Sequence, residues 1–176
     1  MCGIIGINSN KEVTSTILNS LRKLEYRGYD SAGIATLNSG YIQEVKCEGR
    51  VDNLEKNIIK NKLLGNLGIG HVRWATHGIP STLNAHPHSS DNVSVVHNGI
   101  IENSTLLKKF LVKKGHRFKS QTDTEVIVHL ITEYLKKNNL IDTLTKVLKK
   151  LHGSFALGII FKDEPDLIVG ARRGSP

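Results

Sequence analysis

Apolar residues recur every three or four positions in several stretches of the chain, which is the spacing of a helix that packs one face on a core. In the first stretch Val13, Ile17, Leu21 and Leu24 fall on one such face. Polar and charged residues occupy the intervening positions, as expected for the outer face of a surface helix. This pattern predicts helices over residues 12–26, 51–60, 103–115, 122–138 and 141–150.

Two of these helices have recognisable ends. The third begins at Asn103, a residue type favoured at helix starts, and ends at Gly115, a residue type favoured just beyond the last turn. In the fourth, Thr122 and Glu125 have the spacing of a capping box, in which each side chain bonds the other's backbone N–H. We therefore expect the fourth helix to begin at residue 122.

Shorter apolar runs between turn signals predict strands. They cover residues 3–8, LGIGHV, SFALGIIF and DLIVGA. The runs IATL and YIQEVKC flank NSG, which predicts a hairpin. The runs VSVVH and IIEN flank Asn98-Gly99, a dipeptide typical of a tight hairpin turn. A second hairpin is therefore expected there.

The predicted elements do not alternate regularly between strand and helix. Strands and a helix come first, then further strands, then several helices, then two strands, which favours antiparallel sheets with helices in separate layers. The fold class is therefore α+β, and 176 residues suit one domain. Residues 73–92 form a long connection rich in His, Pro, Ser and Asn, and such connections are often functional.

Charge and composition narrow the function classes. The net charge is +8, but lysine dominates over arginine, aromatic residues make up only 5%, and the basic residues fall in pairs along predicted helices. Solvated helix faces explain this better than a nucleic-acid surface, which prefers arginine and aromatic side chains. There is no long apolar run and no secretory leader, so we expect a cytoplasmic protein without membrane contact.

Cys2 and Cys47 are the only cysteines, too few for a disulfide framework and not spaced for a metal. Cys47 is expected to be a small buried residue at a strand end. Cys2 is different, because removal of Met1 would give it the free α-amine of the chain. An α-amine titrates near 7.7–8.0 and can accept the thiol proton, so Cys2 is either a nucleophile with its own base or an accident of position.

Four further residues have both a structural and a functional reading. The Asn98 side chain and the Gly99 N–H could form an oxyanion hole as well as a turn. Arg73 could hold a carboxylate with its planar fork or lie on the surface. Asp123 could bind an ammonium group or favour a helix start. Trp74, the only tryptophan, lies in a polar loop, which suggests a contact or lid residue.

Five histidines crowd one region of the sequence, at positions 71, 77, 86, 88 and 97. They lack the HExxH spacing, and the close pair in HPH is interrupted by proline. No nearby cysteine or glutamate completes a usual ligand set. We therefore expect no metal and no cofactor.

Together the motifs are much more specific than each alone. In order they are MCGIIGI, LEYRGYDSAG, HVRWATHG, NAHPH, VVHNGIIEN and SQTDTEVI. They resemble the glutaminase domains of the glucosamine-6-phosphate synthase family, which are class II glutamine amidotransferases. The likeness extends over essentially the whole chain. It implies an N-terminal nucleophile (Ntn) hydrolase fold, with two antiparallel sheets sandwiched between helical layers.

The resemblance also implies a reaction and roles for individual residues. Cys2, after Met1 removal, would attack the side-chain amide of L-glutamine, release ammonia and form a thioester that water hydrolyses to glutamate. Asn98 and Gly99 match the oxyanion hole of the family, Arg73 the residue that holds the α-carboxylate, and Asp123 the residue that holds the α-ammonium. The remaining matches are Thr76 and His77 in the glutamine pocket, Trp74 in its loop and Arg27 beside the nucleophile.

The sequence departs from the family pattern at two points. Val72 stands where Thr is frequent in the family, directly before Arg73. The chain also ends at GSP, whereas the family continues into sugar-isomerase domains that bind fructose 6-phosphate. We therefore expect residues 1–176 to be a glutaminase domain that is incomplete at its C-terminus. It acts either as the ammonia-supplying part of amino-sugar synthesis, with a missing or separate synthase part, or as a remnant or interaction module without catalysis. The sequence leaves the oligomeric state open.

Overall fold

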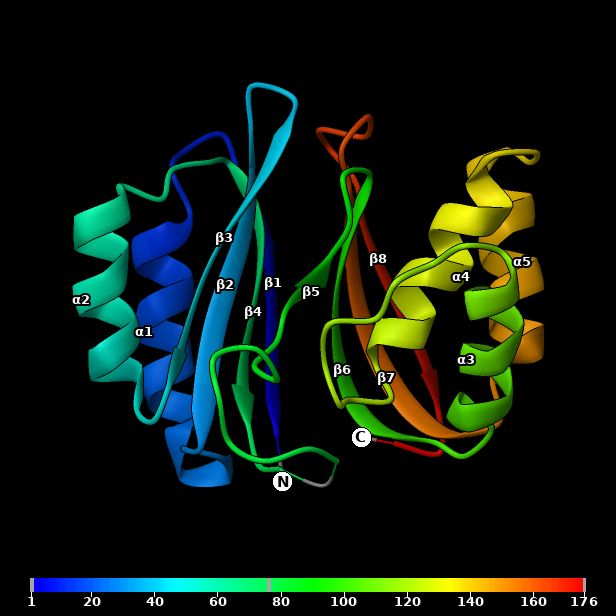
Figure 1. Cartoon of the computed structure of the whole chain (residues 1–176). Coiled ribbons are helices and arrows are strands. Elements are labelled where there is room, and N and C mark those ends of the chain that lie inside the picture. The colour runs from blue at the N-terminus through cyan, green and yellow to red at the C-terminus, as the bar shows by residue number, and fades with distance from the viewer. Residues whose placement is uncertain (1, 76, 176) are drawn as a thin grey trace.

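The computed structural model describes residues 2–75 and 77–175. Two antiparallel sheets of four strands pack face to face, and helices cover the outer face of each (Figure 1). The strand orders are β1-β4-β2-β3 and β5-β6-β7-β8. The predicted α+β class, with antiparallel sheets between helical layers, is therefore confirmed.

The first sheet and its helices are built by the first half of the chain. Strands β1 and β4 pair from Gly3 opposite Val72 to Asn8 opposite Leu67, and β2 pairs with both β3 and β4. Helices α1 and α2 lie on the outer face of this sheet (Figure 1). The elements are β1 (Gly3–Asn8), α1 (Thr14–Leu24), the short helix η1 (Glu25–Arg27), β2 (Ser31–Asn38), β3 (Tyr41–Glu48), α2 (Val51–Asn61) and β4 (Leu67–Arg73).

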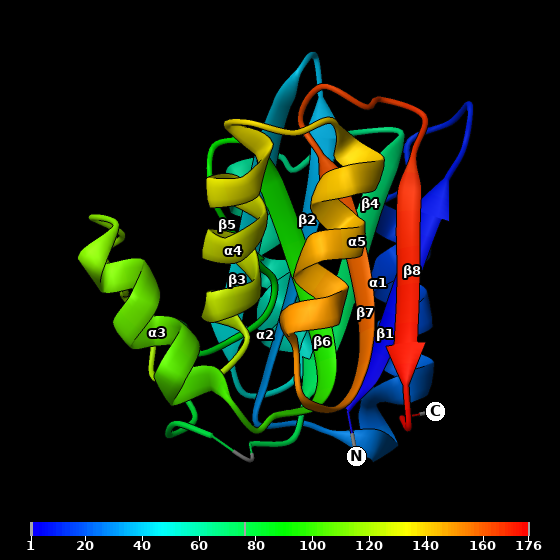
Figure 2. The ribbon, with the colours of Figure 1, turned by 90° about the vertical axis from the view of Figure 1, so that its right-hand side faces the viewer.

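The second half builds the other sheet and its helical layer. Helices α4 and α5 lie over the outer face of β6 and β7, and α3 packs beside α4 and extends beyond the sheet (Figure 2). None of the helices that the structure describes has the length and apolar character needed to span a lipid bilayer. The elements are β5 (His88–Ser89), β6 (Val93–Ile101), α3 (Ser104–Lys113), α4 (Glu125–Leu135), α5 (Leu140–Lys150), β7 (Gly153–Phe161) and β8 (Ile168–Arg173).

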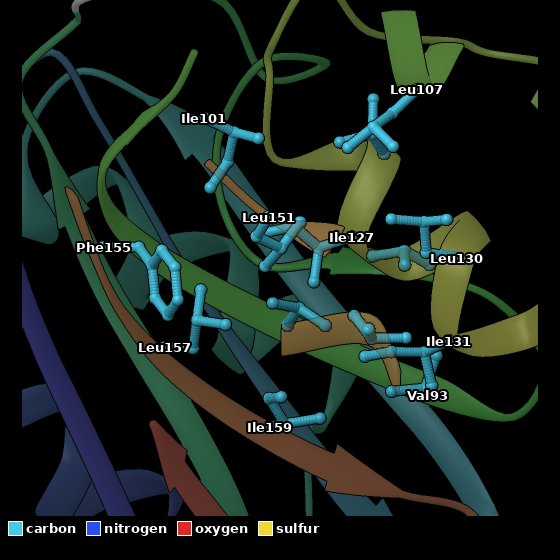
Figure 3. Packing of buried hydrophobic residues seen from close by; sticks show 14 of the residues in the cluster. Val93, Ile101, Leu107, Ile127, Leu130, Ile131, Leu151, Phe155, Leu157 and Ile159 are labelled. Atoms are coloured by element: carbon cyan, nitrogen blue, oxygen red, sulfur yellow. The ribbon is translucent and has the colours of Figure 1, made fainter. Parts of the chain in front are cut away.

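Alternation of side chains along the strands produces three apolar layers: one beneath α1 and α2, one between the sheets, and one beneath the helices of the second half. In β7, Phe155, Leu157 and Ile159 face the helices and pack against α4 side chains such as Ile127 (Figure 3). Ile160, on the opposite face of β7, packs between the sheets with residues of β2 and β4. Both faces of the central strands are thus covered, which explains why β4 is a nearly continuous apolar run. Both views place the first and last described residues at the same end of the molecule (Figures 1 and 2).

The second predicted hairpin is wrong. No turn occurs at Asn98-Gly99, because β6 continues through both residues and pairs with β7 on either side of them. Gly99 has a φ of 125°, and a Cβ there would lie 2.1 Å from the carbonyl oxygen of Ser154 in β7. Glycine is therefore required at position 99 by a close approach of two strands and not by a chain reversal.

The predicted capping box is also wrong. Helix α4 begins at Glu125, so Thr122 and Asp123 precede it. The Thr122 hydroxyl contacts His88 Nε2 at 2.9 Å, and the Glu125 carboxylate accepts hydrogen bonds from the backbone N–H groups of Lys119 and Ser120. Both side chains therefore fasten the preceding loop, which leaves Asp123 at the end of that loop.

Helix α1 approaches β4 closely because β4 carries glycine at the points of contact. Gly70 lies under the helix, and a Cβ at this position would come within 2.5 Å of Cγ2 of Ile17. Ile17 is completely buried and is branched at Cβ, so its Cγ2 methyl group has little room to move. Close contact between helix and sheet therefore depends on the missing side chain.

We predict that Gly70→Ala lowers the free energy of unfolding by roughly 1–3 kcal/mol, since the added methyl group overpacks this contact. Urea denaturation, followed by circular dichroism, measures the change. The matched control is Gly170→Ala in the exposed edge strand β8, where a Cβ would meet nothing within 4 Å. The control is expected to stay within about 0.5 kcal/mol of the parent chain. Equal losses in the two variants would contradict the packing argument.

Candidate active site

A cavity of about 340 Å³ opens where the two sheets end together, near the first and last described residues. Such a volume lies at the lower end of the range for small-molecule pockets, about 300–1,000 Å³. The structure brings eight of the predicted site residues together in its lining. They are Cys2, Arg27, Arg73, Trp74, His77, Asn98, Gly99 and Asp123. The ninth, Thr76, lies outside the described residues.

Cys2 lies directly before β1 and is held against the loop that follows β4. Its Sγ accepts a hydrogen bond from the Trp74 N–H at 3.2 Å and lies 3.5 Å from the Trp74 carbonyl oxygen. Burial raises the pKa of the thiol, and the hydrogen bond from Trp74 opposes that rise. The thiol is thus protonated near neutral pH and needs a base before it can act as a nucleophile.

Asn98 reaches Cys2 from the opposite sheet. Its Nδ2 donates to the Cys2 carbonyl oxygen at 3.3 Å, and its Oδ1 lies 2.9 Å from His71 Nε2. Asn98 and Gly99 are consecutive residues of β6 and both line the cavity beside Cys2. The Asn98 side chain and the Gly99 backbone thus both lie next to the thiol, and a side-chain amide together with a backbone N–H can form an oxyanion hole.

Arg73 ends β4 and is buried, with only 3% of its surface exposed. Its Nη2 donates to the carbonyl oxygens of His77 and, at 3.1 Å, of Gly78. Nη1 lies 3.6 Å from the Asp30 carboxylate, which also accepts a hydrogen bond from the Ala75 N–H. The side chain therefore carries a positive charge into the cavity and at the same time fastens the loop after β4.

Asp123 contributes a negative charge to the lining, from the loop before α4. It is buried, and its Oδ2 accepts a hydrogen bond from the Ile101 N–H at 2.7 Å. This bond joins the loop to the end of β6. The cavity is thus lined by the cationic side chains of Arg73 and Arg27 and by the anionic side chain of Asp123, and charges of both signs suit a zwitterionic ligand.

The other predicted residues surround the cavity. Trp74 is half-exposed, and its ring meets Tyr29 edge to face at a centroid distance of 5.5 Å. Arg27, in η1, lines the cavity beside Cys2, and its buried Nε has no hydrogen-bond partner among the described residues. His77 lines the cavity, and its carbonyl oxygen accepts a hydrogen bond from Arg73.

Sequence reasoning missed the arrangement of the histidines behind the cavity. The rings of His71 and His86 stand 4.4 Å apart between centroids, His88 lies 4.9 Å from His86, and Thr124 contacts both His86 and His97. Burial lowers the pKa of His71 and His88 to about 3 and that of His97 to about 4. Among the described residues no group of three or more His, Cys, Asp or Glu side chains could hold a metal ion. The cluster therefore consists of neutral rings that bond to protein groups.

Comparison with known proteins gives a consistent result. The sequence profile of a family described as "Glutamine amidotransferase domain" matches residues 71–173, more than half of the chain. The whole chain is 56% identical to part of a glutamine–fructose-6-phosphate aminotransferase (isomerizing) from Clostridium acetobutylicum. It is 51% identical to part of a protein of the same description from Mesorhizobium japonicum. The chain spans 29% of the length of each of these curated relatives.

Solved structures agree on the fold. A glutamine phosphoribosylpyrophosphate amidotransferase from B. subtilis, complexed with ADP and GMP, superposes with a TM-score of 0.80 at 30% identity. The match covers 92% of this chain and 35% of that one. A glutamine aminotransferase class-II domain protein from Silicibacter pomeroyi gives a TM-score of 0.56 at 17% identity, over 84% of this chain and 70% of that one. The second likeness shows the fold alone. The Ntn-hydrolase fold that the sequence motifs imply is therefore confirmed.

The buried histidines predict that acid destabilises the chain. An exposed histidine in the unfolded chain titrates near pH 6.5, whereas His88 stays neutral in the fold down to about pH 3. The unfolded state therefore binds more protons between these values, so stability is complete above pH 6.5 and falls as the pH is lowered. Each such histidine contributes a slope of about 1.4 kcal/mol per pH unit.

Urea unfolding between pH 7 and pH 4 measures this slope. His88→Gln keeps a polar group near Thr122 but cannot be protonated, so it is expected to remove one histidine's share of the slope. The exposed His152 provides the control, since its substitution by glutamine should leave the slope unchanged. Identical slopes in all three chains would contradict the assignment of His88 as a buried neutral group.

Proposed function

The chain belongs to the glutamine amidotransferase family, and we propose that it hydrolyses the side-chain amide of L-glutamine to glutamate and ammonia. The observation that carries this proposal is the convergence of Cys2, Asn98, Gly99, Arg73 and Asp123 on one cavity. These residues come from distant parts of the sequence. They supply a nucleophile, two oxyanion donors and two opposite charges, which together suit an amide attached to a zwitterion.

Cys2 acts as the nucleophile once Met1 has been removed. The new α-amine accepts the thiol proton, directly or through a water molecule, and the sulfur attacks the amide carbon of glutamine. The C–N bond then breaks, the amine returns a proton to the leaving nitrogen, and ammonia departs. Water attacks the resulting thioester, the C–S bond breaks, and glutamate leaves with the thiol restored. The raised pKa of the buried thiol is the reason that a nearby base is needed.

Asn98 and Gly99 stabilise the charge that develops on the amide oxygen. The Asn98 Nδ2 already points toward Cys2, where it donates to the carbonyl oxygen of that residue. The Gly99 N–H belongs to β6, so strand pairing restricts its movement. Donors that are fixed before the reaction cost no reorganisation during it, and loss of one such donor typically lowers kcat by about 100- to 1,000-fold.

Arg73 and Asp123 recognise the two charged groups on the α-carbon of glutamine. Arg73 binds the carboxylate and Asp123 the ammonium, and both are buried, so water screens their charges weakly. A guanidinium has five N–H donors, so Arg73 can hold its own loop and a carboxylate together. Thr76 and His77 complete the glutamine pocket, Trp74 covers its entrance, and Arg27 supports the nucleophile.

We further propose that the ammonia serves the synthesis of glucosamine 6-phosphate from fructose 6-phosphate. The support is the similarity to relatives described as glutamine–fructose-6-phosphate aminotransferases, which extend well beyond the matched region. Residues 1–176 would then be the glutaminase domain, and sugar chemistry would belong to another part of the assembly. Two free thiols, at Cys2 and Cys47, fit a reducing compartment such as the cytoplasm.

The first test of function concerns the N-terminus. We predict that only chains beginning at Cys2 release ammonia from glutamine, because retention of Met1 turns the catalytic amine into an amide. Mass spectrometry identifies the two forms, and a coupled ammonia assay measures turnover of each. Cys2→Ala should abolish turnover while glutamine still binds, and Cys47→Ala is the matched control with normal turnover.

Equal rates for the Met1-retaining and trimmed chains would rule out the α-amine as the base. A folded, trimmed chain that releases no ammonia at all would instead support the alternative, a module without independent catalysis.

The second test concerns recognition of the substrate. We predict that Arg73→Gln or Asp123→Asn lowers kcat/KM for glutamine by roughly 30-fold or more, since loss of one partner from a buried charge pair costs on the order of 2–5 kcal/mol. Steady-state ammonia release gives the values. Arg172→Gln, on the exposed strand β8, is the control and should match the parent chain.

Glutamine analogues distinguish recognition from loss of loop structure. Replacement of Arg73 should lower kcat/KM less for an analogue without the α-carboxylate than for glutamine. Replacement of Asp123 should likewise lower kcat/KM less for an analogue without the α-amine. Equal losses of kcat/KM for glutamine and for the analogue would show that these side chains do not recognise the charged groups of the substrate.

A further inference from the structure

His71 connects the two sheets at a point that no part of the proposed mechanism uses. It lies in β4 of the first sheet, opposite Ile4 of β1 and Gly33 of β2. Its Nε2 stands 2.9 Å from Asn98 Oδ1 and 3.0 Å from the His97 carbonyl oxygen, both on β6 of the second sheet. The side chain is completely buried. It therefore contacts an oxyanion donor from the side opposite to the nucleophile.

The surroundings determine which atom carries the proton. Both neighbours of His71 Nε2 are oxygen acceptors, so Nε2 must carry hydrogen and donate it. The Asn98 orientation agrees, because its Nδ2 faces another acceptor, the Cys2 carbonyl oxygen. An amide turned by 180° would place two oxygens together near Cys2 and a hydrogen-bearing nitrogen against Nε2. The two contacts thus support the same orientation.

Packing holds the imidazole in place. The His86 ring lies 4.4 Å from that of His71, tilted by 36°. Gly33 permits this approach, since a Cβ there would come within 2.2 Å of the His86 carbonyl oxygen. Burial also keeps the ring neutral, with a pKa of about 3, so the donor does not change its charge near neutral pH. A rigid, neutral donor is suited to orienting an amide without adding charge to the site.

We propose that His71 is a positioning residue that fixes the Asn98 side chain with its Nδ2 directed at the oxyanion. The inference rests on the proposed glutaminase reaction. Without the His71 bond, the Asn98 Oδ1 loses its donor, so the side chain can rotate and no longer holds its Nδ2 at the developing negative charge. The loss should therefore appear in the chemical step, because glutamine binding uses other groups. It should approach the 100- to 1,000-fold effect of removing an oxyanion donor.

Three variants test this assignment in the chain that begins at Cys2. His71→Leu removes the donor at similar volume and should lower kcat by about 100-fold, with KM changed by less than about threefold. His71→Gln can place an amide nitrogen near the Nε2 position and should recover at least tenfold of that loss. His116→Leu makes the same substitution at a partly buried histidine whose contacts, to His129 and Glu133, lie outside the cavity lining, so kcat should stay near that of the parent.

Alkylation separates a damaged nucleophile from a damaged oxyanion site. Iodoacetamide reacts with Cys2 by displacement of iodide and forms no oxyanion. Peptide mass mapping should therefore find the parent rate of Cys2 labelling in His71→Leu. A double-mutant cycle measures the coupling between His71 and Asn98. His71→Leu should cost little further activity in an Asn98→Ala background.

The outcomes are distinct. A reduced kcat, normal labelling and non-additive losses support the assignment. A parent-like kcat in His71→Leu overturns it, as do fully additive losses or an equal fall in His116→Leu. If the parent chain itself releases no ammonia, the proposed function fails and this inference fails with it, whereas an active parent with an indifferent His71 overturns only the inference.

Discussion

Cys2 and Asn98 come from different sheets, so the geometry between them depends on how the two sheets pack. Cys2 precedes β1, Asn98 lies in β6, and one hydrogen bond of 3.3 Å joins the two residues directly. A second link runs from His71 in β4 to the same asparagine. Both links lie at the end of an apolar layer that includes Ile69 and Val96. A shift of one sheet against the other would break both contacts, so the apolar layer between the sheets sets the precision of the site.

The site gathers polar side chains at a depth where unpaired charges are costly. Arg73 has Asp30 and three loop carbonyl groups as partners, and Asp123 accepts a backbone N–H. The histidines of this region remain neutral, so they add no unpaired charge. Arg73 and Asp123 thus each hold a loop in place and also carry a charge. The groups that we propose to bind the ligand are consequently the same groups that hold the loops after β4 and before α4.

Local patterns predicted most of the fold because most elements follow them. Helices with one apolar face and strands with buried runs appear where periodicity placed them, since their burial agrees with their local preference. The failures lie at the site. Asn98-Gly99 has the sequence of a turn but continues as strand, and Thr122 with Glu125 has the spacing of a cap but fastens a loop. In both cases contacts with residues far along the chain override the local rule, as is common where function imposes a constraint.

The combined motifs indicated which residues line the cavity, whereas the arrangement of these residues could not be predicted. Nothing local indicates that His71 contacts Asn98, because the contact depends on the register of β4 in one sheet and of β6 in the other. The histidines show the same limit. Their spacing in the sequence argued against a metal site but did not indicate that the rings pack together. Gly33 completes the point. Its missing side chain admits the His86 backbone, which packs on the ring that orients Asn98. A residue without a side chain thereby contributes to the geometry of the oxyanion site, through two layers of packing that only the tertiary structure reveals.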